Sequence, residues 1–152
     1  MQAETGAHAP DRSHRLSILT RQEIDDLYGL LRFSDEDRLT YFELDEPEES
    51  RAIRQRTVPI AIHLALQLGY FRARRQFFDY ELETVRDDLQ YIERRHFPGT
   101  DLTGISQPSQ PTRRALRNNI LELSGYRLCD NAARAELARR AQRIAMRSTQ
   151  PV

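Results

Sequence analysis

The chain is most apolar over Val58-Pro-Ile-Ala-Ile-His-Leu-Ala-Leu-Gln-Leu-Gly-Tyr-Phe71, a stretch with few polar side chains. A membrane-spanning helix needs about 20 consecutive apolar residues, so this shorter stretch predicts a buried core helix. Pro59 suits the first turn of that helix, and Gly69 predicts its end because glycine often interrupts helices. The expected fold therefore has one central helix that other elements cover.

Three helix-start patterns precede the central helix, each with a short polar side chain that can cap free backbone amides. Thr20-Arg-Gln-Glu23 has the spacing of a capping box and predicts a helix over about 21–31. Ser34 and the acids after it predict a second helix to about 43, and Asp45 predicts a third that ends near residue 57. These patterns place four side chains in the core: Leu39, Phe42, Leu44 and Ile53.

Three more helices are expected after the central one. Asp79 is a candidate cap for a helix that ends before Pro98. Turn-forming residues fill 98–111 and predict a linker. A helix then precedes Gly125, which favours a C-terminal stop, and Asp130 caps a last helix that reaches about residue 147. The apolar positions expected inside are Leu82, Val85, Leu89, Ile92, Leu116, Ile120 and Leu123.

No stretch of alternating polar and apolar residues between hairpin turns predicts a strand. We therefore expect an all-α fold, a multi-helix bundle. Its expected organisation is a disordered tail over 1–15, an N-terminal helical subdomain over 16–97, a linker over 98–111 and a C-terminal basic helical segment over 112–152.

Charge is distributed unevenly along the chain, although the formal net charge is zero. Residues 1–50 carry 13 acidic side chains and 5 arginines, whereas residues 101–152 carry 4 acidic side chains and 9 arginines. A local basic face can bind phosphates whatever the total charge is, so the second half of the chain favours a polyanionic partner. Every basic residue is arginine, which codon usage explains more simply than function does.

Several function classes lack the residues that they need. The four histidines are scattered without ligand partners, and no phosphate-binding loop or nucleophile motif occurs, so we expect no metal, no cofactor and no catalysis. His63, on the apolar helix, is expected to be a hydrogen-bonded core histidine. One cysteine and the lack of a signal-peptide pattern favour the cytoplasm, with no membrane partner.

The densest mixture of arginine and aromatic residues follows the central helix, in Tyr70-Phe-Arg-Ala-Arg-Arg-Gln-Phe-Phe78. Arg72, Arg74 and Arg75 could grip the phosphate backbone of a nucleic acid. The alternative is that the aromatic rings close the core while the arginines are merely solvated. Composition alone leaves both interpretations open.

The second candidate is the start of the helix after the linker, in Ser109-Gln-Pro-Thr-Arg-Arg-Ala-Leu-Arg-Asn-Asn119. Helix-turn-helix proteins present such a helix start to the DNA major groove, where Arg pairs with guanine and Asn with adenine. The bundle is therefore expected to contain helix-turn-helix-like DNA-binding modules. The alternative is a solvated helix face. The candidate side chains are Arg113, Arg114, Arg117 and Asn118.

Four stretches resemble the N-terminal DNA-binding portion of Tn-three family replicative transposases. They are Arg15–Gly29, Arg32–Leu44, Ala65–Arg72 and Thr112–Arg127, and the resemblance extends over about Arg15–Arg147. It implies a helical region that binds double-stranded DNA at the terminal inverted repeats of the transposon. It also implies that the acidic catalytic triad belongs to a downstream RNase-H-like domain, which these 152 residues lack.

A second function remains open, that of a helical protein-interaction module. In that case the acidic first fifty residues would dock to other domains or subunits of a transposase. Such a role would explain the acidic residues better than DNA binding does.

Overall fold

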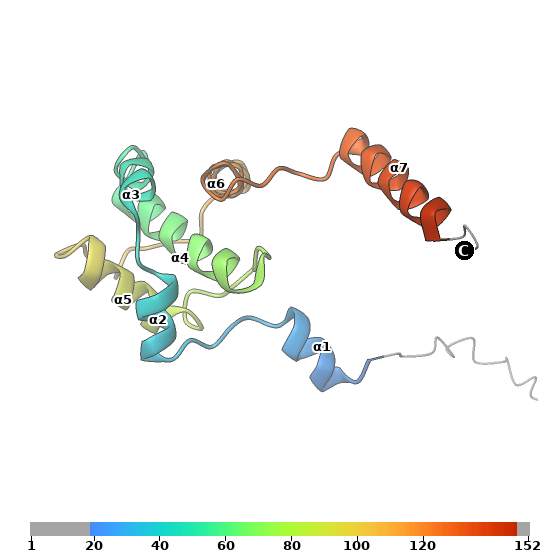
Figure 1. The fold of residues 1–152 in the computed structure, drawn as a ribbon. Coiled ribbons are helices and arrows are strands. Elements are labelled where there is room, and N and C mark those ends of the chain that lie inside the picture. Colours follow the sequence, from blue (N-terminus) through green and yellow to red (C-terminus); the bar gives the residue numbers. More distant parts are fainter. Residues whose placement is uncertain (1–18, 149–152) are drawn as a thin grey trace, which may run out of the picture. The chain divides into compact units, whose positions relative to one another are not determined.

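The computed structural model describes residues 19–148, and these residues form seven helices and no strand, as Figure 1 shows. The expected all-α fold is confirmed. The chain divides into two units, residues 1–31 and residues 32–152, and each is described by itself. The tail expected over 1–15 lies outside the described residues.

The described part of the first unit contains α1 (Arg21–Tyr28), which begins with the predicted capping box. Thr20 Oγ1 accepts a hydrogen bond from the Glu23 amide at 3.2 Å, and the Thr20 amide donates to the Glu23 carboxylate at 2.7 Å. The helix ends at Gly29, earlier than expected. Its larger apolar side chains remain exposed, namely Ile24, Leu27 and Tyr28.

Two short helices open the second unit, α2 (Asp35–Tyr41) and α3 (Glu46–Ile53), and both begin with capping boxes, at Ser34 and Asp45. Phe42 is fully buried as predicted. Leu39 and Ile53 were expected in the core, and both predictions are wrong, because these side chains are 58% and 78% exposed.

The exposure of Ile53 follows from the face that α3 turns toward the core. Glu48 and Ala52, one helical turn apart, are its buried residues. Ala52 belongs to the core cluster that contains Ala61 and Leu64 of α4, and Ile53, the next residue along the helix, points elsewhere.

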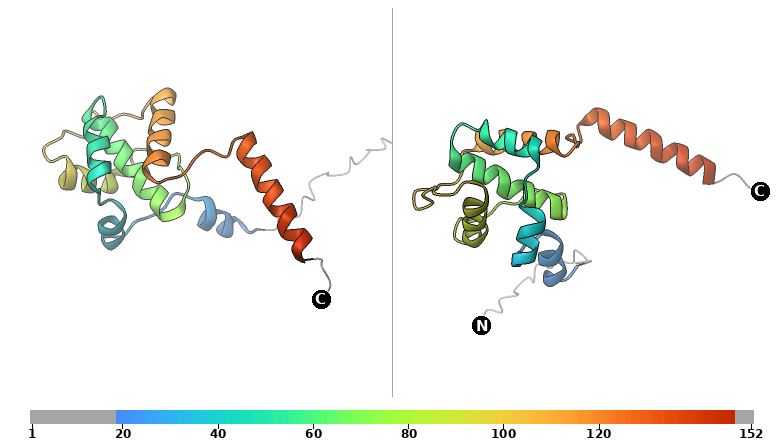
Figure 2. Two further views of the ribbon diagram at one scale, coloured as in Figure 1. Left: turned by 45° about the horizontal axis from the view of Figure 1, so that its top comes forward. Right: turned by 60° about the vertical axis from the view of Figure 1, so that its left-hand side comes forward.

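The central helix is α4 (Val58–Arg74), which contacts α2, α3, α5 (Arg86–His96) and α6 (Gln110–Leu123). Figure 2 shows from two further directions that α3 and α6 lie side by side on α4. Arg51 of α3 joins them through an ion pair of 2.9 Å with Glu122 of α6. All eleven residues from Ala61 to Phe71 are buried.

Gly69 does not end α4, contrary to the prediction, because the helix continues for five more residues to Arg74. This glycine provides space for a neighbour instead. A Cβ atom at this position would overlap the ring of Phe42 and lie 3.1 Å from the carbonyl oxygen of Tyr41. Glycine therefore lets the end of α2 pack directly on α4.

Asp79 does not cap α5, because this helix begins only at Arg86, after an irregular segment. Buried hydrogen bonds hold the segment in place: the Gln67 side chain donates to the Phe78 carbonyl at 2.6 Å. Val85, Leu89 and Ile92 are buried as expected. Ser109 caps α6, and Gly125, at φ 71°, follows its end as predicted.

Two ion pairs, each with a buried carboxylate, attach the short helices to the core. Asp88 of α5, 5% exposed, accepts hydrogen bonds from Arg38 Nε at 2.7 Å and from the Tyr70 hydroxyl. Arg72 of α4 pairs with Glu48 of α3. Because a buried charge without its partner is costly, these contacts fix α2 and α3 in one position.

The last helix is α7 (Asn131–Ser148), which begins where the Asp130 carboxylate accepts a hydrogen bond from the Ala133 amide at 2.8 Å. Nearly all its described side chains are exposed, Leu137 and Ile144 among them. Its single acid, Glu136, pairs with Arg139 and Arg140 at 2.8 and 3.0 Å. None of the described helices has the length and apolarity to cross a membrane.

Candidate nucleic-acid interface

The two arginine-rich segments predicted from the sequence lie next to each other in the structure. Asp79, in the segment after α4, is 3.8 Å from Arg113 and 3.6 Å from Arg117 of α6. The guanidinium of Arg117 also lies 5.5 Å from the centre of the Phe77 ring. The fold thus joins side chains about 40 residues apart in sequence.

We call four basic residues of this region the arginine surface: Arg75, Arg114 and Arg117, which are exposed, and Arg113, which is half-buried. Arg113, Arg114 and Arg117 line a hollow together with Gln110 and Asp79. Polar side chains form most of its wall. Such a concave, basic lining suits an anion more than an apolar ligand.

The sequence of α6 explains why it presents arginine outward. Leu116 and Ile120, one turn apart, are buried against the core. Residues one turn apart share a helix face, so Arg117 and Asn118 point away from the face of Leu116 and Ile120 and are exposed. Arg114, two residues before Leu116, is exposed as well.

Arg75 lies where α4 ends, and aromatic rings connect it to the rest of the arginine surface. It has the left-handed backbone conformation, at φ 56°, that closes the helix. Its guanidinium lies 5.8 Å from the centre of the Phe71 ring and 5.5 Å from that of Tyr126. The rings of Phe71 and Phe77 stack at 4.9 Å, and Arg117 covers the second of them. Tyr70, Phe71 and Phe78 are buried, as the core interpretation of this segment expects, and phosphate contact by its arginines stays a prediction.

Arg72 and Arg74, the other candidates from this segment, are placed differently from Arg75. Arg72 donates hydrogen bonds to the carbonyl oxygens of Tyr41 and Glu43 and to the Glu48 carboxylate. These bonds satisfy its guanidinium inside the fold, so we assign Arg72 to holding α2 and α3 against α4. Arg74 is exposed on the last turn of α4.

The segment that carries Phe77 and Asp79 is anchored by His63, which is 1% exposed. His63 Nε2 faces the carbonyl oxygen of Ser106 at 3.0 Å and must donate to it, so Nδ1 accepts from the Tyr80 hydroxyl at 2.6 Å. Burial lowers the pKa of His63 and raises the pKa of Tyr80, which favours this neutral arrangement. The expectation of a hydrogen-bonded core histidine is confirmed.

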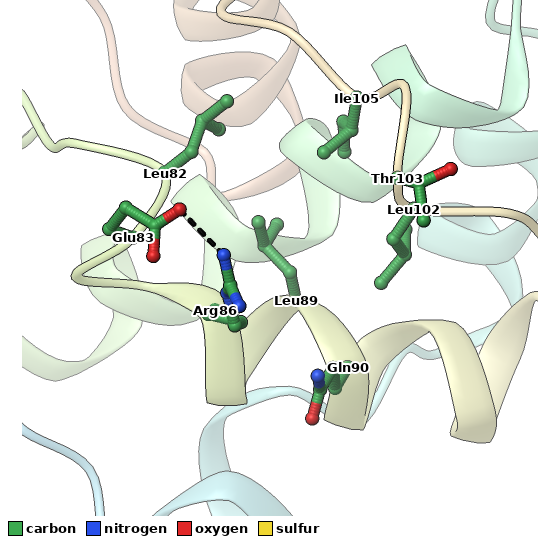
Figure 3. A pocket seen from close by; sticks show the side chains of 8 residues that line it. All are labelled: Leu82, Glu83, Arg86, Leu89, Gln90, Leu102, Thr103 and Ile105. Atoms are coloured by element: carbon green, nitrogen blue, oxygen red, sulfur yellow. Dashed lines mark hydrogen bonds and ion pairs between the residues drawn. The ribbon is translucent and has the colours of Figure 1, made fainter.

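A second hollow, shown in Figure 3, lies between α5 and the loop before α6. Leu89 of α5 faces Leu102 and Ile105 of the loop across it. Arg86 and Glu83 form an ion pair of 2.6 Å on one side of this hollow. Because these two charges satisfy each other, they offer little to a ligand, and we do not assign a site here. Residues 19–148 also contain no group of three or more side chains placed to hold a metal ion.

The sequence did not predict Phe77, Asp79 and Tyr126 as parts of the interface. Asp79 was interpreted as a helix cap, and Phe77 was left open between closing the core and lying beside the candidate arginines. The sequence did contain one indication that Asp79 belongs to a basic region, because it is the first acid after a stretch rich in arginine. Its partners on α6 could not be inferred, because only the tertiary fold brings them together.

Fold and surface together define an all-α unit that exposes an arginine surface. Residues 18–152 match the model of a family described as a domain of unknown function, DUF4158, so the chain belongs to this family. The family is known to occur in transposases. No curated protein and no solved structure matches the chain.

Proposed function

We propose that this chain binds double-stranded DNA through its arginine surface, as the N-terminal, non-catalytic module of a Tn-three family transposase that recognises the terminal inverted repeats. The observation that carries the proposal is that Arg113, Arg114 and Arg117 line one hollow, and that the stacked rings of Phe71 and Phe77 connect Arg75 to Arg117. The occurrence of the family in transposases and the sequence resemblance both support it.

The proposal assigns two kinds of contact to this surface. Arg75 and Arg114 are suited to phosphates, since phosphate contacts position a protein on DNA without reading sequence. Arg117 and Asn118 lie next to each other on α6 and match the pairings of Arg with guanine and Asn with adenine in the major groove. Leu116 and Ile120, buried on the opposite side, would hold the reading helix to its scaffold.

A binding titration tests the proposal directly. The probe is a duplex with the terminal inverted repeat of the element that encodes the chain, and its control is a scrambled duplex of equal composition. We expect the repeat to bind more tightly, and affinity to fall steeply with salt, with a log–log slope of about −0.9 for each neutralised phosphate. Equal affinity for both duplexes would exclude sequence-specific recognition.

A protein-interaction role is the second candidate, and the exposed apolar side chains of α1 favour it. Ile24, Leu27 and Tyr28 are each more than 40% exposed, beside the acids Asp25 and Asp26. Exposed apolar groups with a charged rim are typical of protein interfaces. Calorimetric titration with the remaining domains of a transposase tests this role, which predicts binding that Leu27→Arg abolishes and Arg117→Ala leaves unchanged.

A further inference from the structure

Asp79 is the single acidic side chain that lines the hollow of the arginine surface. Its carboxylate is 82% exposed and lies 3.8 Å from Arg113 and 3.6 Å from Arg117. Both distances exceed that of an ordinary charge-assisted hydrogen bond, so the pairs are loose and the arginines can still accept another partner. An anion that enters this hollow must therefore approach a carboxylate as well as three guanidinium groups.

We propose that Asp79 determines the specificity of the arginine surface by penalising phosphate contacts more than base contacts. This inference rests on the proposed function. A phosphate is charged and is repelled by the carboxylate, whereas the O6 and N7 acceptors of guanine are neutral. An arginine has five N–H donors, so Arg117 can pair with Asp79 through one nitrogen and offer the others to a base.

The surroundings of Arg117 support this division of its donors. The Phe77 ring lies 5.5 Å from its guanidinium and the Asp79 carboxylate lies 3.6 Å from Nη2, so Asp79 faces one nitrogen of the group and leaves the others for a base. Specificity is a difference between affinities, and disfavouring the competing contact increases it as effectively as improving the correct one.

Asp79 is itself held in position. The next residue, Tyr80, donates to His63, and the preceding residue, Phe78, accepts from Gln67 through its carbonyl oxygen. Buried hydrogen bonds therefore fix the backbone on both sides of this exposed carboxylate. If the segment that carries Asp79 were mobile, the carboxylate could move aside when a phosphate approaches. The hydrogen bonds of Phe78 and Tyr80 oppose that movement.

The test compares Asp79→Asn with Glu81→Gln, which removes the same charge from an exposed acid two residues away. The probe is the duplex that the wild-type chain enriches from a random-sequence pool, measured beside its scrambled counterpart at several salt concentrations. For Asp79→Asn we expect affinity for the scrambled duplex to rise about three- to tenfold, as for the loss of two weak ion pairs. Affinity for the enriched duplex rises less, so the discrimination ratio falls. Asp79→Glu, which keeps the carboxylate, retains the wild-type ratio.

Three results would overturn the inference. One is an unchanged ratio in Asp79→Asn, and another is an equal change in Glu81→Gln, which would show a general effect of charge. A third is a lowered ratio in Asp79→Asn with unaltered affinity for scrambled DNA. Thermal unfolding of each variant confirms that the fold is intact. If the wild-type chain enriches no sequence at all, the proposed function fails, and this outcome is distinct from the other three.

Discussion

Gly69 shows how one missing side chain decides a packing contact. Alanine is favoured over glycine within a helix by about 1 kcal/mol, so propensity alone predicts that Gly69→Ala stabilises the protein. The new methyl group would overlap the buried Phe42 ring, and overpacking a core typically costs about 1–3 kcal/mol. We expect a net loss in the free energy of unfolding, measured by urea denaturation.

The matched control is Gly104→Ala, in the loop before α6. A Cβ atom there would meet no heavy atom within 4 Å. We expect this variant to be neutral or slightly stabilising, since alanine restricts the unfolded chain more than glycine does. A stabilised Gly69→Ala variant would mean that Phe42 moves aside easily and that the contact is not tight.

Leu66 lies in the middle of α4 and is fully buried. We expect Leu66→Ala to lower the free energy of unfolding by about 2–5 kcal/mol, because deleting buried methylene groups leaves a cavity. Ile53→Ala provides the comparison, since Ile53 is 78% exposed and its truncation should change stability by less than about 0.5 kcal/mol. Chemical denaturation measures both, and a larger loss from Ile53→Ala would contradict the burial described for α3.

His63 links two segments of the chain, because it is hydrogen-bonded to Tyr80 in the segment after α4 and to Ser106 in the loop before α6. Burial lowers the pKa of His63 below the 6.5 of an unperturbed histidine, so the unfolded chain takes up a proton at this site before the folded one does. Stability should therefore fall as the pH drops below about 6.5, by up to about 1.4 kcal/mol per pH unit from this residue. Above that pH both states are neutral and no effect is expected.

Denaturation at pH 7.5 and 5.5 measures this contribution. The variant His63→Gln keeps a polar side chain but does not titrate, so its stability should depend less on pH over this interval. Its overall stability should be lower, because the bonds to Tyr80 and Ser106 are specific to the imidazole ring. Equal pH dependence in both proteins would show that His63 is not the responsible group.

The helix α6 and the segment after α4 are expected to contribute differently to DNA binding. Replacing Arg117 or Asn118 by Ala should cost about 1–3 kcal/mol on the terminal repeat and much less on scrambled DNA. Replacing Arg74 or Arg75 by Ala should weaken binding to both duplexes about equally, because phosphate contacts carry no sequence information. Anisotropy titrations at one salt concentration measure these effects. If the α6 variants keep the wild-type discrimination, another helix reads the DNA.

At the scale of the whole molecule, local patterns predicted local structure well. Capping boxes at Thr20 and Ser34 and the glycine stop at Gly125 involve only neighbouring residues, and all three are present. The predictions that failed depend on distant partners. Gly69 continues its helix because Phe42 packs on it, and Ile53 is exposed because α3 turns Ala52 and Glu48, the partner of Arg72, toward the core.

The candidate interface also depends on contacts between residues that are distant in sequence. The sequence shows two arginine-rich segments, since composition is visible without a fold. It could not separate Arg72, which binds α2 and α3, from Arg75, which is exposed only three residues away. That difference depends on where the ends of α2 and α3 lie in space. Tertiary geometry thus decides which arginines remain available.

The position of α4 among four other helices has a consequence for the exchange of its amide hydrogens with solvent. Residues 61–71 are buried from every side, so their amides should exchange with deuterium only when the whole second unit unfolds. Amides of α7, whose side chains are almost all exposed, should exchange by local opening. Mass-spectrometric exchange should therefore give protection in α4 that follows global stability and much weaker protection in α7, and equal protection of both helices would contradict this. The most apolar stretch of the chain would then take up deuterium last.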